Sequence, residues 1–86
     1  KDVYWLRLVE VTDTGLRVTL EREITESIGV ALKHYDEWIL EHENTTDKRL
    51  LVDILYIHEG QFSTIREHHL WNRHECEVTE DVMKVE

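Results

Sequence analysis

The stretch that decides the fold is VYWLRLVEVTDTGLRVTLEREI, residues 3–24. Its two runs of apolar, β-branched and aromatic residues are separated by Asp13-Thr14-Gly15. A three-residue loop that ends in glycine is typical of a hairpin with a type I turn and a bulge, in which Gly15 takes the left-handed backbone conformation. With Thr12 opposite Leu16, the expected cross-strand pairs are Glu10–Val18, Val9–Thr19, Leu8–Leu20 and Arg7–Glu21.

The next segment has the spacing of an amphipathic helix, with apolar residues at Ile28, Ala31, Leu32, Tyr35 and Ile39. Thr25 is expected to cap a helix that runs from about Glu26 to His42. Gly29, near its start, costs roughly 1 kcal/mol relative to alanine. Either this glycine allows a close approach to the sheet, or the helix begins one turn later.

The second half predicts another hairpin. Residues 49–58 are apolar on both faces, which is typical of a central strand. Glu59-Gly60 reads as a two-residue turn, and residues 62–71 return antiparallel. The expected pairs are Ile54–Ile65, Ile57–Phe62 and Asp53–Arg66.

These elements predict one α+β domain over residues 1–86, in the order ββαββ. We expect a four-stranded antiparallel sheet with one helix packed across it. Residues 75–86 form an acidic tail in this interpretation, either a short helix that begins near Thr79 or an edge strand.

The opening stretch, Thr12-Asp13-Thr14-Gly15 followed by Leu16 to Glu21, resembles the first hairpin of ubiquitin-like β-grasp proteins. The predicted helix follows at the corresponding place, so the resemblance covers about 30 residues. It implies a β-grasp-like architecture. It implies no conjugation activity, because the sequence shows no terminal Gly-Gly pair.

Composition narrows the classes of function. Nineteen acidic residues against ten basic ones give a formal net charge of −9, and such a surface repels nucleic acid and anionic membranes. The sequence has no run of apolar residues long enough to span a bilayer, and it shows no phosphate loop, nucleophile elbow or HExxH motif. We therefore expect a protein that is not an enzyme and uses no cofactor. Cys76 is the only cysteine, which favours a reducing, cytoplasmic location.

The histidines offer two alternatives. His74 and Cys76, with His68 or His69 upstream, supply the nitrogen and sulfur ligands that zinc takes, although the spacing matches no familiar zinc module. Adjacent residues of a strand point to opposite faces, so His68 and His69 are not expected to share one site. Acid/base pairs at His58–Glu59 and Glu67–His68 are the other alternative, and the six histidines could also sense pH.

Acidic side chains gather in two zones, either as docking surfaces or as solubilising ones. On the helix they crowd the carboxyl-terminal half, where they oppose the helix dipole, and the tail holds a second group. Acidic side chains that destabilise the helix electrostatically favour a role in docking on a basic partner. Some inhibitors use such acidic patches to imitate nucleic acid. The residues are Asp36, Glu37, Glu41 and Glu43 on the helix, and Glu77, Glu80 and Asp81 in the tail.

Trp5 and Val9 are expected on the outer face of the first hairpin, away from the helix. If both are exposed, they form an apolar patch of the kind that marks an interface or a homodimer, with Trp71 as a further contact. Otherwise another element, such as the tail, covers them. The sequence thus predicts a small acidic module that binds another protein through these aromatic and acidic residues. A metal-binding domain is the alternative.

Overall fold

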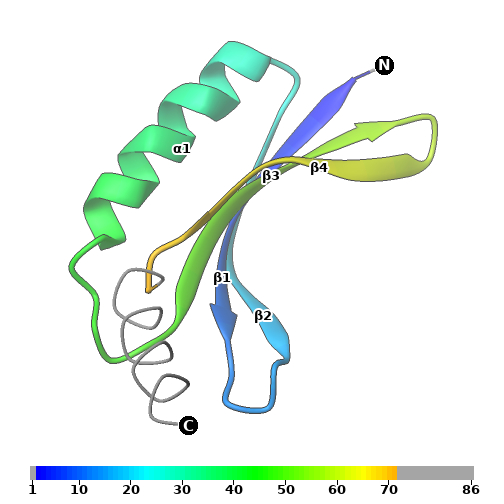
Figure 1. The fold of residues 1–86 in the computed structure, drawn as a ribbon. Coiled ribbons are helices and arrows are strands. Elements are labelled where there is room, and N and C mark those ends of the chain that lie inside the picture. Colours follow the sequence, from blue (N-terminus) through cyan, green and yellow to red (C-terminus); the bar gives the residue numbers. More distant parts are fainter. Residues whose placement is uncertain (1, 72–86) are drawn as a thin grey trace, which may run out of the picture.

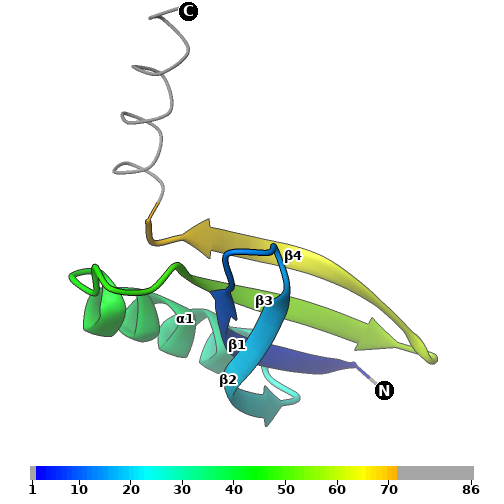
Figure 2. The same cartoon turned by 90° about the horizontal axis from the view of Figure 1, so that it is seen from below.

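In a computed structural model, residues 2–71 are described, and they form the predicted ββαββ order (Figure 1). The strands are β1 (Val3–Val11), β2 (Arg17–Thr25), β3 (Leu50–His58) and β4 (Gln61–His69), and the helix is α1 (Ile28–His42). The sheet order is β2-β1-β3-β4, with every pair antiparallel, and α1 packs on one face (Figure 2). The α+β prediction is confirmed. The resemblance to β-grasp proteins lies in the order of the elements along the chain. In this sheet the two central strands, β1 and β3, pair antiparallel.

The first hairpin closes as its loop residues predict. Gly15 has a φ of 90°, and its amide donates to the Thr12 carbonyl at 2.9 Å. The Thr12 amide donates to the Leu16 carbonyl at 2.8 Å, which confirms the pairing at the turn. The predicted register holds as far as Val9–Thr19.

Beyond Thr19 a bulge in β2 overturns the rest of that register. Leu20 is the extra residue, so Leu8 lies opposite Glu21 and Arg7 opposite Arg22. The predicted pairs Leu8–Leu20 and Arg7–Glu21 are therefore wrong. A bulge bends an edge strand and increases its twist, and no local sequence signal marks this one.

The second hairpin repeats this pattern. Glu59 and Gly60 have φ values of 52° and 81°, as a two-residue turn with both central residues left-handed requires, and Ile57 lies opposite Phe62. A bulge at Ile65 then shifts the register by one residue. The expected pairs Ile54–Ile65 and Asp53–Arg66 are wrong, because Ile54 lies opposite Arg66 and Asp53 opposite Glu67.

The helix begins later than Thr25 and Glu26. Ser27 is the N-cap, and its hydroxyl accepts from the Val30 amide at 3.2 Å. Thr25 ends β2, where its hydroxyl accepts from the Ser27 amide at 3.1 Å. A Cβ at Gly29 would meet nothing nearer than the Ser27 hydroxyl at 3.7 Å. Gly29 is the second residue of the helix, so neither a start one turn later nor a close approach to the sheet explains this glycine.

Gly29→Ala is expected to stabilise the fold by about 0.5–1 kcal/mol, because alanine lowers the entropy of the unfolded chain and its methyl group has room. Urea denaturation measures the change. Gly15→Ala is the matched control, and it should destabilise the fold because φ at Gly15 is +90°. A loss of stability in Gly29→Ala would contradict this view of the helix start.

The core lies between α1 and the sheet. Even-numbered residues of β1 and β3 face the helix, and the buried cluster consists of Leu6, Leu8, Ala31, Tyr35, Leu50, Val52, Ile54 and Leu70. β3 is central, as predicted from its apolar faces. The expectations for residues 75–86, a short helix or an edge strand, lie outside the described residues.

Candidate interaction surfaces

The sheet has a second face, opposite α1, which we call the outer face. Odd-numbered residues of β1 and β3 lie on it, and no described helix or strand covers it (Figure 2). The register aligns its residues in rows that cross all four strands. These rows are Ile24–Trp5–Leu55–Thr64, then Arg22–Arg7–Asp53–Glu67, then Thr19–Val9–Leu51–His69.

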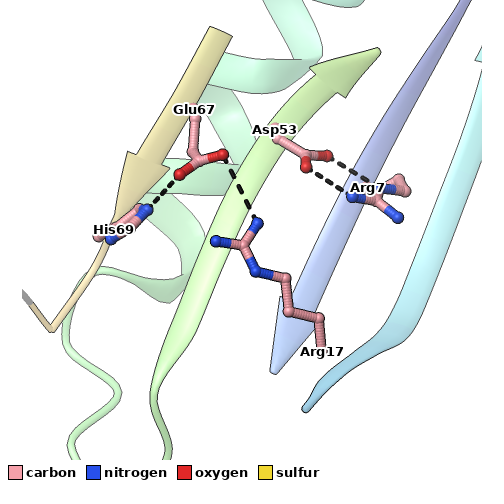
Figure 3. A network of polar contacts seen from close by, with 5 residues as sticks. All are labelled: Arg7, Arg17, Asp53, Glu67 and His69. Carbon is pink, nitrogen blue, oxygen red and sulfur yellow. Dashed lines mark hydrogen bonds and ion pairs between the residues drawn. The ribbon is translucent and has the colours of Figure 1, made fainter. Parts of the chain in front are cut away.

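The second row, here called the charged row, contains a buried ion pair. Arg7 donates to both carboxylate oxygens of Asp53, with Nε at 3.0 Å and Nη2 at 2.7 Å (Figure 3). Asp53 is only 1% exposed, so its charge depends on Arg7 for compensation. The hydrogen bonds to Asp53 raise the pKa of Arg7 above its ordinary value. The sequence predicted a charge pair for Asp53 but assigned it to Arg66.

A second ion pair reaches across the sheet. Arg17 on β2 lies 3.6 Å from Glu67 on β4, above the two central strands (Figure 3). Glu67 also bonds to His69, whose ring stacks on Trp71 at 4.8 Å between centroids. The hydrogen bond with His69 is the largest cause that lowers the pKa of Glu67 below its ordinary value of 4.5.

The lowered pKa of Glu67 predicts a contribution to stability above pH 4.5 that is lost as the pH falls through the folded-state value. Glu67→Gln should therefore be less stable than the wild type at neutral pH, by up to about 1 kcal/mol for a partly exposed pair. The difference should shrink below pH 4.5. Urea midpoints over a pH series test this, with exposed Glu21→Gln as control. A gap that is constant with pH would contradict the assignment.

The row containing Trp5 and the strand ends beyond it form an apolar band, defined here as Val3, Trp5, Ile24, Leu55, Ile57 and Phe62. Phe62 is 70% exposed and Ile24 is 53% exposed. The Arg22 guanidinium lies over the Trp5 ring, 4.8 Å from its centre. Trp5 is half-buried, and it lies on the outer face as the sequence predicted.

The burial of Val9 corrects the prediction that Trp5 and Val9 form an exposed apolar patch. Its side chain is fully buried, as is that of its neighbour Leu51, so Val9 offers no surface to a partner. Trp71 is half-buried and lies at the other end of the outer face from Trp5, beside His69. It lines a hollow of about 460 Å³ between the first turn and the loop that joins α1 to β3.

The acidic helix residues lie on the other side of the sheet from Trp5. Asp36, Glu37 and Glu41 are exposed on α1 around Leu40, which is 66% exposed. Glu43 is the C-cap residue and is half-buried. The aromatic and acidic residues that the sequence combined into one module therefore form two separate surfaces. Glu77, Glu80 and Asp81 lie outside the described residues.

Histidines bond to carboxylates that are not their neighbours in sequence. The predicted pair Glu67–His68 is replaced by Glu67–His69. His58 Nδ1 lies 2.8 Å from Asp2, whereas its Nε2 is 3.7 Å from Glu59. A third pair joins His34 to Glu23.

The cluster at Asp2 was missed by the sequence reasoning, because strand pairing brings Asp2 beside residues that lie 54 and 56 positions further along the chain. Tyr56 donates its hydroxyl to Asp2 at 3.0 Å. The hydrogen bonds from His58 and Tyr56 lower the pKa of Asp2, and the bond to Asp2 raises the pKa of Tyr56. Tyr56 and His58 line a shallow hollow of about 230 Å³.

The predicted metal ligands do not meet within the described part of the chain. His68 lies opposite Val52 and His69 opposite Leu51, so the two rings lie on opposite faces of the sheet, as their adjacency predicted. No group of three metal-ligating side chains occurs among residues 2–71. His74 and Cys76 lie outside the described residues.

Two further findings bear on function. Within residues 2–71, no helix is both long and apolar enough to cross a membrane. No family model, curated protein or solved structure matches this chain.

Proposed function

We propose that this protein is a non-catalytic acidic module that docks on a basic protein partner through the outward face of α1. The observation that carries the proposal is an exposed leucine surrounded by exposed carboxylates. Leu40 is 66% exposed, Asp36 and Glu37 lie one helical turn before it, and Glu41 follows it directly. An apolar anchor within a charged rim is the arrangement that protein interfaces use. A cytoplasmic location, favoured by the single cysteine, belongs to the same proposal.

The distribution of charge supports a basic partner. The arginines of the first hairpin, Arg7, Arg17 and Arg22, lie on the outer face, and exposed Lys33 is the one lysine or arginine of α1. Complementary charge speeds such an encounter and orients it. Glu41 in the last helical turn opposes the helix dipole at a cost of a few tenths of a kcal/mol, which favours a purpose beyond stability.

The test is capture from a lysate of the source organism at low salt. The bait is the wild type or the triple variant Asp36→Asn, Glu37→Gln, Glu41→Gln. We expect the wild type to retain a protein of basic isoelectric point that is released as salt rises, because salt screens exposed charges. The triple variant should lose it. Removing these carboxylates relieves like-charge repulsion on α1, so the variant should remain at least as stable as the wild type.

A control of equal charge isolates the position of the acids. Asp13→Asn, Asp47→Asn and Glu59→Gln neutralise three exposed carboxylates outside α1. This control should retain the partner. If the two triple variants lose the partner equally, net charge alone determines binding. Capture that does not depend on salt would contradict the proposal.

A narrower form of the proposal is an inhibitor whose partner binds nucleic acid. Carboxylates on α1 would then occupy a site built for phosphates. Duplex DNA should compete with the protein for the captured partner. A partner that binds DNA and this protein together would exclude the inhibitor and leave an adaptor.

A further inference from the structure

We propose that the outer face binds the outer face of a second copy of this chain, in a symmetric dimer whose two-fold axis runs parallel to the strands. This surface lies on the opposite side of the sheet from α1 (Figure 2). The dimer therefore leaves the acidic face of α1 free, and it stands independently of the docking function.

The charged row of one copy is complementary in charge to the same row of a second copy, when the second row runs in the opposite strand order. Across the sheet order β2-β1-β3-β4 its residues are Arg22, Arg7, Asp53 and Glu67, which is positive, positive, negative, negative. A two-fold axis along the strands places β2 against β4 of the second copy and β1 against β3. Arg22 then faces Glu67 of the partner subunit. Each copy supplies the same contact, so the pairing occurs twice.

The other two-fold axis within the plane of the sheet gains no such pairing when it passes through the charged row. An axis perpendicular to the strands places each strand against itself in the second copy. Arg22 would then face Arg22 of the partner subunit, and Glu67 would face its own equivalent. Like charges at close range disfavour that arrangement, whereas the axis along the strands brings opposite charges together.

The apolar band fits the same axis. An axis along the strands keeps each row at its own height, so the band of one copy covers the band of the other. Ile24 on β2 then faces Thr64 on β4 of the second copy, one row from Phe62, which is 70% exposed in the single chain. Two sheets related in this way have aligned strands, which is the packing of β-sandwiches, about 10 Å apart.

The test is sedimentation equilibrium of the purified full chain over a range of concentrations. The wild type should approach twice its chain mass of 10.4 kDa. Arg22→Glu sets a second glutamate against Glu67 in both contacts, and Glu67→Arg sets two arginines together. Each variant alone should dimerise about tenfold or more weakly. A heterodimer of the two variants has an opposite-charge pair at both contacts, so in a mixture it should form in preference to either homodimer.

Apolar variants test the band separately. Phe62→Ala should weaken the dimer by about tenfold, whereas Leu16→Ala should leave it unchanged. Leu16 is 66% exposed but lies at the first turn, away from the band. Arg22 and Phe62 are exposed, so these variants should fold even if Glu67→Arg does not, and circular dichroism checks each one.

A wild type that stays monomeric at submillimolar concentration would overturn the proposal. So would a dimer that ignores both Arg22→Glu and Phe62→Ala, because it would use another surface. A mixture of Arg22→Glu with folded Glu67→Arg that fails to form heterodimer would overturn the axis along the strands.

Discussion

Replacing Arg7 by methionine is expected to destabilise the fold by about 3–5 kcal/mol, the cost of leaving a buried charge without its partner. Asp53 is 1% exposed and holds the Arg7 guanidinium by two hydrogen bonds, at 3.0 and 2.7 Å. A domain of 86 residues has roughly 4–13 kcal/mol of stability in total, so this variant should be close to unfolding. Urea denaturation at one fixed protein concentration measures the loss.

The double variant Arg7→Met, Asp53→Val separates the pair from its surroundings. Buried ion pairs can often be replaced by apolar residues at little cost. The double variant should therefore recover most of the stability that Arg7→Met loses. The single variant Asp53→Val completes the comparison. If the loss of stability in the double variant equals the sum of the losses in Arg7→Met and Asp53→Val, Arg7 does not compensate the charge of Asp53, and the account of the charged row is wrong.

Leu6→Ala is the second large expected effect. Leu6 is fully buried in the cluster between α1 and the sheet, and truncation of a core leucine costs about 2–5 kcal/mol. Leu40→Ala is the matched control, because the same atoms are removed from a leucine that is 66% exposed. Its stability should change by less than about 0.5 kcal/mol.

The same pair of variants separates stability from binding. Leu40→Ala should weaken capture of the basic partner while the fold remains intact, because Leu40 is the proposed anchor. Leu6→Ala should weaken capture only to the extent that it unfolds the chain. Equal effects of the two variants on stability would contradict the assigned packing of α1.

Local chemistry explains which parts of the fold the sequence could predict. Both turns follow from glycine: Gly15 and Gly60 have positive φ, and the registers next to them are correct. The errors begin at the bulges, Leu20 and Ile65. A bulge depends on the twist of an edge strand against its neighbour, which period-two alternation does not encode.

Long-range pairing explains what was missed at the candidate surfaces. Asp53 pairs with Arg7, a residue 46 positions away, because β1 and β3 are neighbours in the sheet. The first half of the chain alone does not specify that neighbour. Alternation placed Trp5 correctly on the outer face, but alternation alone does not reveal that Val9, on the same face, is fully buried. Trp5 and the acidic residues of α1 lie on opposite sides of the sheet, which becomes clear only once the helix is placed against the sheet.

The most direct test of the central claim is native mass spectrometry of the protein isolated from its own lysate, at low and then moderate salt. The central claim is that the acidic face of α1 docks on a basic partner. We predict that a basic protein accompanies the wild type at low salt and leaves as salt rises. It should not accompany the Asp36→Asn, Glu37→Gln, Glu41→Gln variant. A partner that stays bound at moderate salt, or that binds this variant equally well, would contradict the claim.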